Sequence, residues 1–324
     1  CSCCGDRWRR RGRRGDRVAR RVDVDGALAK QPPHLDVVPG VAREVQRREA
    51  AGETEPSGEV RVALEFDRKS FANTVTKMGE VWCTNISSGA TVHRRITNDN
   101  TPNIFWHHHD ILEKNDEHPL LIYDWAQWKQ SWAVQRSNEH GRKSFCLEIA
   151  DNDGVAHQVR LTKKSNIAPF LELVNSKQAR EIEINVNQKN RWGLLCFIQA
   201  RRRDLLKRPD ISRRVDRKAL PAFFSKLAQC QHTQRVTLVN SVCKLTCEAK
   251  FNSSICDDKK VRLESPDVIF HLDNSSVEEA WMVQCGCGCG EEVLDMYDMD
   301  NRLIASIACM GITEEMARLL PSLN

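Results

Sequence analysis

The sequence contains no stretch of about 20 consecutive apolar residues, the length that a helix needs to cross a bilayer. Its N-terminal segment has no apolar core of the kind found in secretory signals. It also has no glycine-rich phosphate-binding loop and no Ser-His-Asp or Cys-His set of a hydrolase. We therefore expect a cytoplasmic protein with no membrane partner, and the sequence argues against a nucleotide-binding or triad enzyme.

The composition is that of a globular protein. Charged residues make up 29% of the 324 residues and hydrophobic residues 40%, and this length predicts about two domains. The fourteen cysteines are too scattered for a small disulfide scaffold. Free cysteine behaves as a small hydrophobe, so we expect buried thiols and a reducing compartment. The cysteines to which this applies are Cys83, Cys146, Cys196, Cys230 and Cys309.

Basic charge is concentrated at one end of the chain. Nine arginines fall between Arg7 and Arg21, and residues 1–59 show no hydrophobic periodicity. Such a composition cannot bury enough apolar surface to offset the entropy of ordering. The segment is predicted to be a disordered, Arg-rich tail. Arginines can neutralise phosphates, but a solvated tail is the preferred interpretation, and no nucleic-acid partner is expected.

The rest of the chain contains an internal repeat. Trp132 precedes Asp151 by 19 residues, Trp281 precedes Asp298 by 17, and each aspartate begins an Asp-x-Asp turn. Repeats of this size define the architecture. The predicted units are a first repeat over residues 60–180, a helical connector over 181–219 and a second repeat over 220–324.

Each repeat has the pattern of helix, hairpin, long loop, strand meander and helix. Short alternating strands joined by polar turns are typical of antiparallel sheets. The sequence therefore predicts an α+β fold of two tandem, structurally similar repeats, each a large antiparallel sheet with helices packed on one face. Helices are expected over 66–78, 166–175, 192–206, 220–228 and 313–320, with Ser212 or Asp216 as one cap and Ser275 or Ser276 as another.

Several segments carry a resemblance to a known family. They are Gly79–Asn85, Trp132–Val134, Ser144–Ile149 and His157–Leu161 in the first half, and Phe270–Leu272, Trp281–Val283 and Val293–Asn301 in the second. Their order and spacing resemble the haemin-utilisation and haemin-degrading proteins of the HemS/ChuS/ChuX type. The resemblance covers about residues 66–323. It implies haem as the cofactor and haem handling in the bacterial cytoplasm, by transfer or degradation.

The resemblance also implies a haem site with altered ligation. The family's ligand histidine follows a tryptophan on the connector helix; Trp192 matches that tryptophan, and Gln199 falls at the histidine. Glutamine lacks the imidazole nitrogen that ferric haem favours. At the position of the family's propionate-neutralising arginine this sequence has Ile122. At the position of a second family arginine it has Asp273, and at the position of a family lysine it has Cys285. The implied cofactor-binding residues are Gln199, His271, Arg201, Arg202, Trp192 and Cys285, although His271 also suits a core or pocket position.

Two short motifs suggest metal binding instead. His107 and His109 share one face of an extended segment and are candidate ligands. The run Cys285–Cys289 places three thiols on one side, a pattern that suits soft metals but lacks a zinc site's second cysteine pair. The segment Asp151–Gly154 is predicted to be a turn, because a calcium loop would need glutamate where Thr162 stands.

Three functions follow from these patterns. The first is haem binding and handling in iron utilisation, with haem and a haem-transfer or redox protein as partners. The second is an interaction or regulatory module that kept this fold and lost haem. The third is a Cys/His metal-binding protein.

Overall fold

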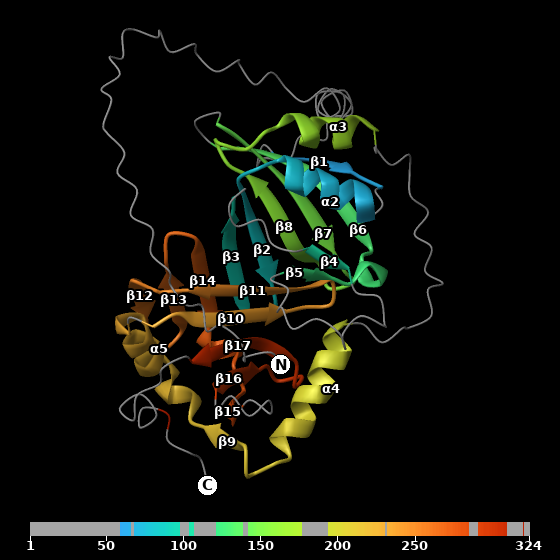
Figure 1. Ribbon diagram of the computed structural model, residues 1–324. Coiled ribbons are helices and arrows are strands. Elements are labelled where there is room, and N and C mark those ends of the chain that lie inside the picture. Colours follow the sequence, from blue (N-terminus) through green and yellow to red (C-terminus); the bar gives the residue numbers. More distant parts are fainter. Residues whose placement is uncertain are drawn as a thin grey trace, which may run out of the picture.

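The computed structural model describes residues 59–65, 68–97, 104–106, 121–138, 142–176, 194–230, 232–284, 291–309 and 320. In this part of the chain the strands form two large sheets, and a few helices pack around them (Figure 1). Almost all neighbouring strands are antiparallel. The predicted α+β class is confirmed.

The larger sheet has nine strands in the order β1-β6-β7-β8-β2-β3-β14-β13-β12. Its strands are β1 (Glu59–Ala63), β2 (Val81–Ile86), β3 (Ala90–Ile96), β6 (Gln130–Ser137), β7 (Lys143–Ala150), β8 (Val155–Leu161), β12 (Ser253–Cys256), β13 (Lys260–Glu264) and β14 (Val268–Asp273).

The other sheet has eight strands in the order β4-β5-β11-β10-β17-β16-β15-β9. Its strands are β4 (Ile104–Trp106), β5 (Leu121–Tyr123), β9 (Ser212–Val215), β10 (Gln234–Val239), β11 (Cys243–Ala249), β15 (Glu279–Gln284), β16 (Glu292–Tyr297) and β17 (Leu303–Cys309). The pair β4–β5 is parallel.

The two repeats exchange strands. Strand β14, from the second repeat, pairs with β3 and carries β13 and β12 into the nine-stranded sheet. Strand β5, from the first repeat, pairs with β11 and carries β4 into the eight-stranded sheet. Neither sheet is therefore built from one predicted range alone, and the range boundaries themselves remain predictions.

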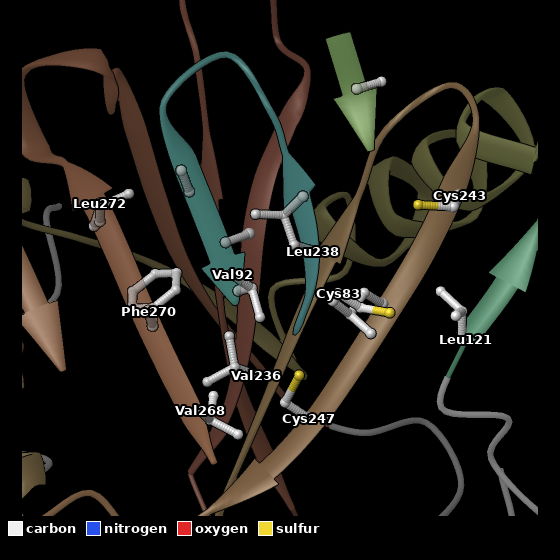
Figure 2. Close-up of a cluster of buried hydrophobic side chains, with 14 of the residues drawn as sticks. Cys83, Val92, Leu121, Val236, Leu238, Cys243, Cys247, Val268, Phe270 and Leu272 are labelled. Carbon is white, nitrogen blue, oxygen red and sulfur yellow. The ribbon is translucent and has the colours of Figure 1, made fainter. Parts of the chain in front are cut away.

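The inner faces of the two sheets pack against each other to form a shared core. Figure 2 shows side chains from β2, β3 and β14 meeting side chains from β10 and β11. Cys83 is fully buried there, as expected for a small apolar residue, and Cys247, for which burial was not predicted, is fully buried beside it. Cys146 is also buried, but Cys196 is exposed and Cys230 only partly buried. The expectation of burial was wrong for Cys196, because it lies on the solvent side of its helix.

The described residues form four α-helices, and three of them cover what remains of the inner faces. The four are α2 (Arg68–Lys77), α3 (Ala168–Ser176), α4 (Leu194–Leu206) and α5 (Leu220–Gln229), with 3-10 turns at Trp125–Gln127, Arg217–Ala219 and Asn274–Ser276. Helices α2 and α3 contact each other, and Phe170 of α3 lies against Phe145 of β7. Helix α5 begins with Leu220-Pro221, where proline is tolerated, and contacts β12 and β13. Helix α4 lies elsewhere, on an outer face.

The repeated Trp-to-Asp stretch fastens the repeats to one another. The Asp151 carboxylate accepts a hydrogen bond from the Ser241 hydroxyl, and the Asp298 carboxylate accepts one from the Ser88 hydroxyl at 2.8 Å. Each serine lies in a hairpin turn of the opposite repeat. Each aspartate also accepts from the backbone N–H two residues later, so the predicted turn at Asp151 is confirmed.

The structure corrects some local expectations. Ser212 lies in strand β9 and caps no helix, whereas Asp216 accepts from Lys218 N and caps the following 3-10 turn. Asp273, not Ser275 or Ser276, caps the next 3-10 turn. The strands β4, β9, β12 and β13 were not predicted. The expected helix at 313–320 lies outside the described residues except for Leu320.

Candidate functional site

Helix α4 packs on the outer face of the eight-stranded sheet, where it contacts β9, β11 and β15 (Figure 1). Ile198, Gln199 and Arg202 are partly buried, whereas Ala200 and Arg201 are exposed. Residues three or four apart share one face of a helix. Gln199 and Arg202 therefore face the sheet together. We call the region between α4 and this outer face the α4 interface.

The α4 interface is anchored on a buried carboxylate. Asp295 on β16 is 0% exposed, and its neighbours Leu294 and Met296 point into the core. Its Oδ2 lies 3.2 Å from the Arg202 Nη1, and its Oδ1 accepts a 2.6 Å hydrogen bond from the Ser306 hydroxyl. Burial raises the pKa of Asp295, while Arg202 and the hydrogen bonds oppose that rise.

Two further contacts hold the helix at this position. The Arg203 Nη2 donates to the carbonyl oxygen of Asn301 at 2.9 Å, which ties α4 to the turn between β16 and β17. The Ser212 hydroxyl donates to the Leu206 carbonyl oxygen at 3.2 Å, at the C-terminal end of the helix. The contacts of Arg202, Arg203 and Leu206 all lie on the C-terminal side of Gln199, and together they hold the helix that carries Gln199 against the sheet.

Gln199 itself has an unmet hydrogen bond. Its Nε2 atom is buried and has no hydrogen-bond partner among the described residues. A buried donor without an acceptor costs roughly 1–3 kcal/mol. Such an atom in a native fold calls for an explanation, and one explanation is a ligand that supplies the acceptor.

Polar side chains from the sheet face the helix. Thr237 on β10 and Thr246 on β11 share a hydrogen bond of 3.2 Å, and Lys244 lies two residues before Thr246 on the same face. The pKa of Lys244 is lowered to about 8, mainly by burial and then by the charges of Arg202 and Arg235. The surface under α4 is therefore polar and locally cationic.

The structure brings together only some of the predicted residues. Gln199 and Arg202 lie in the α4 interface. Arg201 is on the same helix but is exposed, so it lies outside the α4 interface, and its predicted cofactor-binding role stays a prediction. Trp192, Cys285, His107 and His109 lie outside the described residues, and their roles stay predictions.

His271 lies on β14 of the other sheet. Its neighbours Phe270 and Leu272 point into the core, so His271 faces the opposite outer surface from α4. Its ring meets that of His93 edge-on at 5.5 Å, and it lines a surface pocket of about 620 Å³ with Thr91 and Arg262. His271 thus lines a pocket, which agrees with the expectation of a core or pocket position. It does not share a site with Gln199.

Lys244, Asp295 and Ser306 were missed by sequence reasoning. Asp295 did carry a signal, because it is an acid in the otherwise apolar strand Val293–Tyr297. An acid at such a position needs a buried partner, but the partner's identity depends on where α4 lies. Lys244 gave no such signal, since lysine is common on the outer face of a strand.

The described residues contain no group of three or more His, Cys, Asp or Glu side chains that could hold a metal ion. A search of their helices finds none long and apolar enough to cross a membrane.

These features define a class of protein: two intertwined α+β repeats in which a connecting helix covers the outer face of one sheet. Sequence comparison with protein-family models finds no match, and comparison with curated proteins finds none either. Solved structures do share the fold. The E. coli haem oxygenase ChuS superimposes with a TM-score of 0.61 at 16% identity, covering 80% of this chain and 87% of ChuS.

A second similar structure is the haem-bound form of PhuS, a haem-binding protein from Pseudomonas aeruginosa. It superimposes with a TM-score of 0.64 at 14% identity and covers 88% of this chain and 99% of PhuS. The resemblance to the HemS/ChuS type is therefore confirmed as a likeness of fold.

Proposed function

We propose that this protein binds haem at the α4 interface, between Gln199 on the helix and the outer face of the eight-stranded sheet. The observation that carries the proposal is the buried Nε2 of Gln199, which has no acceptor among the described residues. Gln199 is also the residue that the resemblance puts at the ligand position. The likeness of fold to ChuS and PhuS supports the same choice.

The residues present fit part of a haem site. Arg202 and Lys244 supply positive charge of the kind that binds carboxylates. Glutamine is a weak iron ligand compared with imidazole. The proposal is therefore haem binding with altered ligation, and it concerns binding and transfer of haem.

Gln199→His tests the site by adding the missing ligand. We expect wild-type protein to shift the Soret band of haemin, and Gln199→His to give the spectrum of a histidine-ligated ferric haem with at least tenfold tighter binding, about 1.4 kcal/mol. Ala200→His is the matched control, because Ala200 is the next residue on α4 and is exposed. It should leave the wild-type spectrum unchanged.

Two results would argue against the proposal. If micromolar haemin gives no Soret shift with wild-type protein or with Gln199→His, the fold has been kept without haem, as the interaction-module alternative holds. If Ala200→His has the same effect as Gln199→His, haem binds elsewhere. The cytoplasmic location and a haem-transfer or redox partner stay predictions.

A further inference from the structure

We propose that Lys244 binds a carboxylate group of the ligand held at the α4 interface. The inference rests on the proposed haem binding and deepens it, because haem carries two propionate carboxylates on an otherwise apolar ring. It assigns to Lys244 the selection of a carboxylate-bearing ligand over a neutral one.

The position of Lys244 favours this role. It lies near the start of β11, on the face that α4 covers, and is partly buried. Its register partners are Ile122 on β5 and Val239 on β10, so both neighbouring strands present apolar side chains beside it. An ammonium group between two aliphatic side chains matches the chemistry of an apolar ring with a charged edge.

The charges around Lys244 leave it without a counter-ion. Arg202 pairs with Asp295. On β10, Arg235 pairs with Glu248 at 3.0 Å and with Glu291 at 3.3 Å. Among the described residues, Lys244 has no carboxylate partner. A partly buried ammonium without a counter-ion costs free energy, which an anionic ligand group would offset.

A second observation that supports a carboxylate ligand is the unmet hydrogen bond of Gln199. Its buried Nε2 also lacks an acceptor, and it projects from α4 on the same face as Arg202, whose charge acts on Lys244. One unmet donor thus comes from the helix and one from the sheet. Tyr297, on strand β16 of the same sheet, is not a third, because its hydroxyl donates to Asp295 at 3.4 Å. Both unmet groups call for an acceptor, which is what a carboxylate-bearing ligand supplies.

The experiment compares haemin with haemin dimethyl ester, in which both carboxylates are blocked. Lys244→Met keeps the length of the side chain and removes its charge. We expect it to weaken haemin binding about tenfold, the effect of one charge-assisted hydrogen bond, and to leave binding of the diester unchanged. Lys244→Arg should restore haemin binding. Circular dichroism should show the same fold for all three proteins, because Lys244 has no ion-pair partner in the described part of the chain.

A pH series gives a second measurement on the wild-type protein. The pKa of Lys244 is about 8, so the ammonium is present below that pH and is lost above it. Haemin affinity should therefore hold from pH 7 to 8 and fall above pH 8. The diester should show no such fall, and neither should Lys244→Arg, whose guanidinium stays charged.

The outcomes separate the two proposals. If wild-type protein binds neither haemin nor the diester, both proposals fail. If it binds haemin and Lys244→Met binds it equally well, only the role of Lys244 fails. The same holds if Lys244→Met weakens haemin and the diester to the same extent, because that result indicates a change of shape and no recognition of charge.

Discussion

The two outer faces of the molecule carry the same buried acid at the same place. Trp132 pairs in register with Glu148, as Trp281 pairs with Asp295. The next strands then present Gln158 opposite Glu148 and Ser306 opposite Asp295. Both acids are 0% exposed. The repeats thus retain an acid at the centre of each outer face, although almost nothing else in the two sequences matches there.

The counter-charges differ between the faces. Glu148 lies 2.6 Å from Arg136 on β6 and 3.4 Å from Arg61 on β1, both from its own sheet. Among the described residues, Asp295 pairs with one cation, Arg202, and that residue belongs to α4. The first acid fastens the strands of its own sheet together, whereas the second fastens a helix over its sheet. The difference explains how a helix covers the outer face of one sheet without a change in the alternation of the strands beneath it.

The largest expected effect on stability comes from removing Arg202, the cation that pairs with Asp295. Arg202→Met leaves Asp295 buried without a counter-charge, and we expect a loss of about 3 kcal/mol in the free energy of unfolding at pH 7. Urea denaturation measures it. Arg201→Met, an exposed neighbour on the same helix, should change stability by less than about 0.5 kcal/mol. Equal effects of the two substitutions would show that the Asp295 contact does not anchor α4.

The loss in Arg202→Met should depend on pH. Burial already raises the pKa of Asp295 above its usual 3.8, and removing Arg202 raises it further. When the pKa of an acid is higher in the folded state than in the unfolded state, the folded protein loses stability as pH rises from the unfolded pKa to the folded pKa. Lowering the pH should therefore reduce the gap between Arg202→Met and wild type. A gap that does not change down to pH 4 would contradict this.

A smaller effect is expected on the other face. Arg136→Met leaves Glu148 with Arg61 and with a 2.8 Å hydrogen bond from Gln158. The expected loss is about 1 kcal/mol, measured by the same denaturation. Adding Glu148→Gln to Arg136→Met should recover part of it, because the buried charge is then gone. If Arg136→Met costs as much stability as Arg202→Met, then Arg61 does not stabilise the charge of Glu148, and the proposed difference between the faces is wrong.

An effect of similar size to that of Arg136→Met is expected for His93, which stands where the other face has Thr246. Its Nδ1 lies 2.9 Å from the Thr84 hydroxyl, as Thr246 contacts Thr237. Burial first, and then the charges of His271, Arg160 and Arg262, lower the pKa of His93 to about 4. A base with a lowered pKa in the folded state contributes stability that is present above its unfolded pKa and lost as pH falls.

His93→Thr should therefore make the protein less sensitive to acid. We expect wild-type protein to lose about 1 kcal/mol more than the variant between pH 7 and pH 5, a value reduced for partial exposure. The fully buried His157, whose pKa is lowered to about 3, affects both proteins equally. Identical pH profiles would mean that His93 does not titrate as its surroundings indicate.

Much of the local structure could be predicted from the sequence. The alternation in Val81–Ile86 and Ala90–Ile96 predicts the hairpin β2–β3, and the apolar spacing at Phe170, Leu173 and Val174 predicts α3. The edge strands were harder. Strand β12 has no fully buried side chain, so hydrophobic periodicity gives little signal there. Strand β13 does alternate, with Val261 and Leu263 buried between charged residues, and this was a signal that could have predicted it.

By itself, the sequence determined the repeat and the fold class, because hydrophobic spacing and turn residues act over a few positions. Only the tertiary structure decided which strands each sheet contains, because β5 and β14 pair across the repeats. It alone separated His271 from Gln199, by placing them on opposite outer faces. It alone joined Arg202 to Asp295 and left Lys244 unpaired, because contacts between residues distant in the chain depend on how helix and sheet pack.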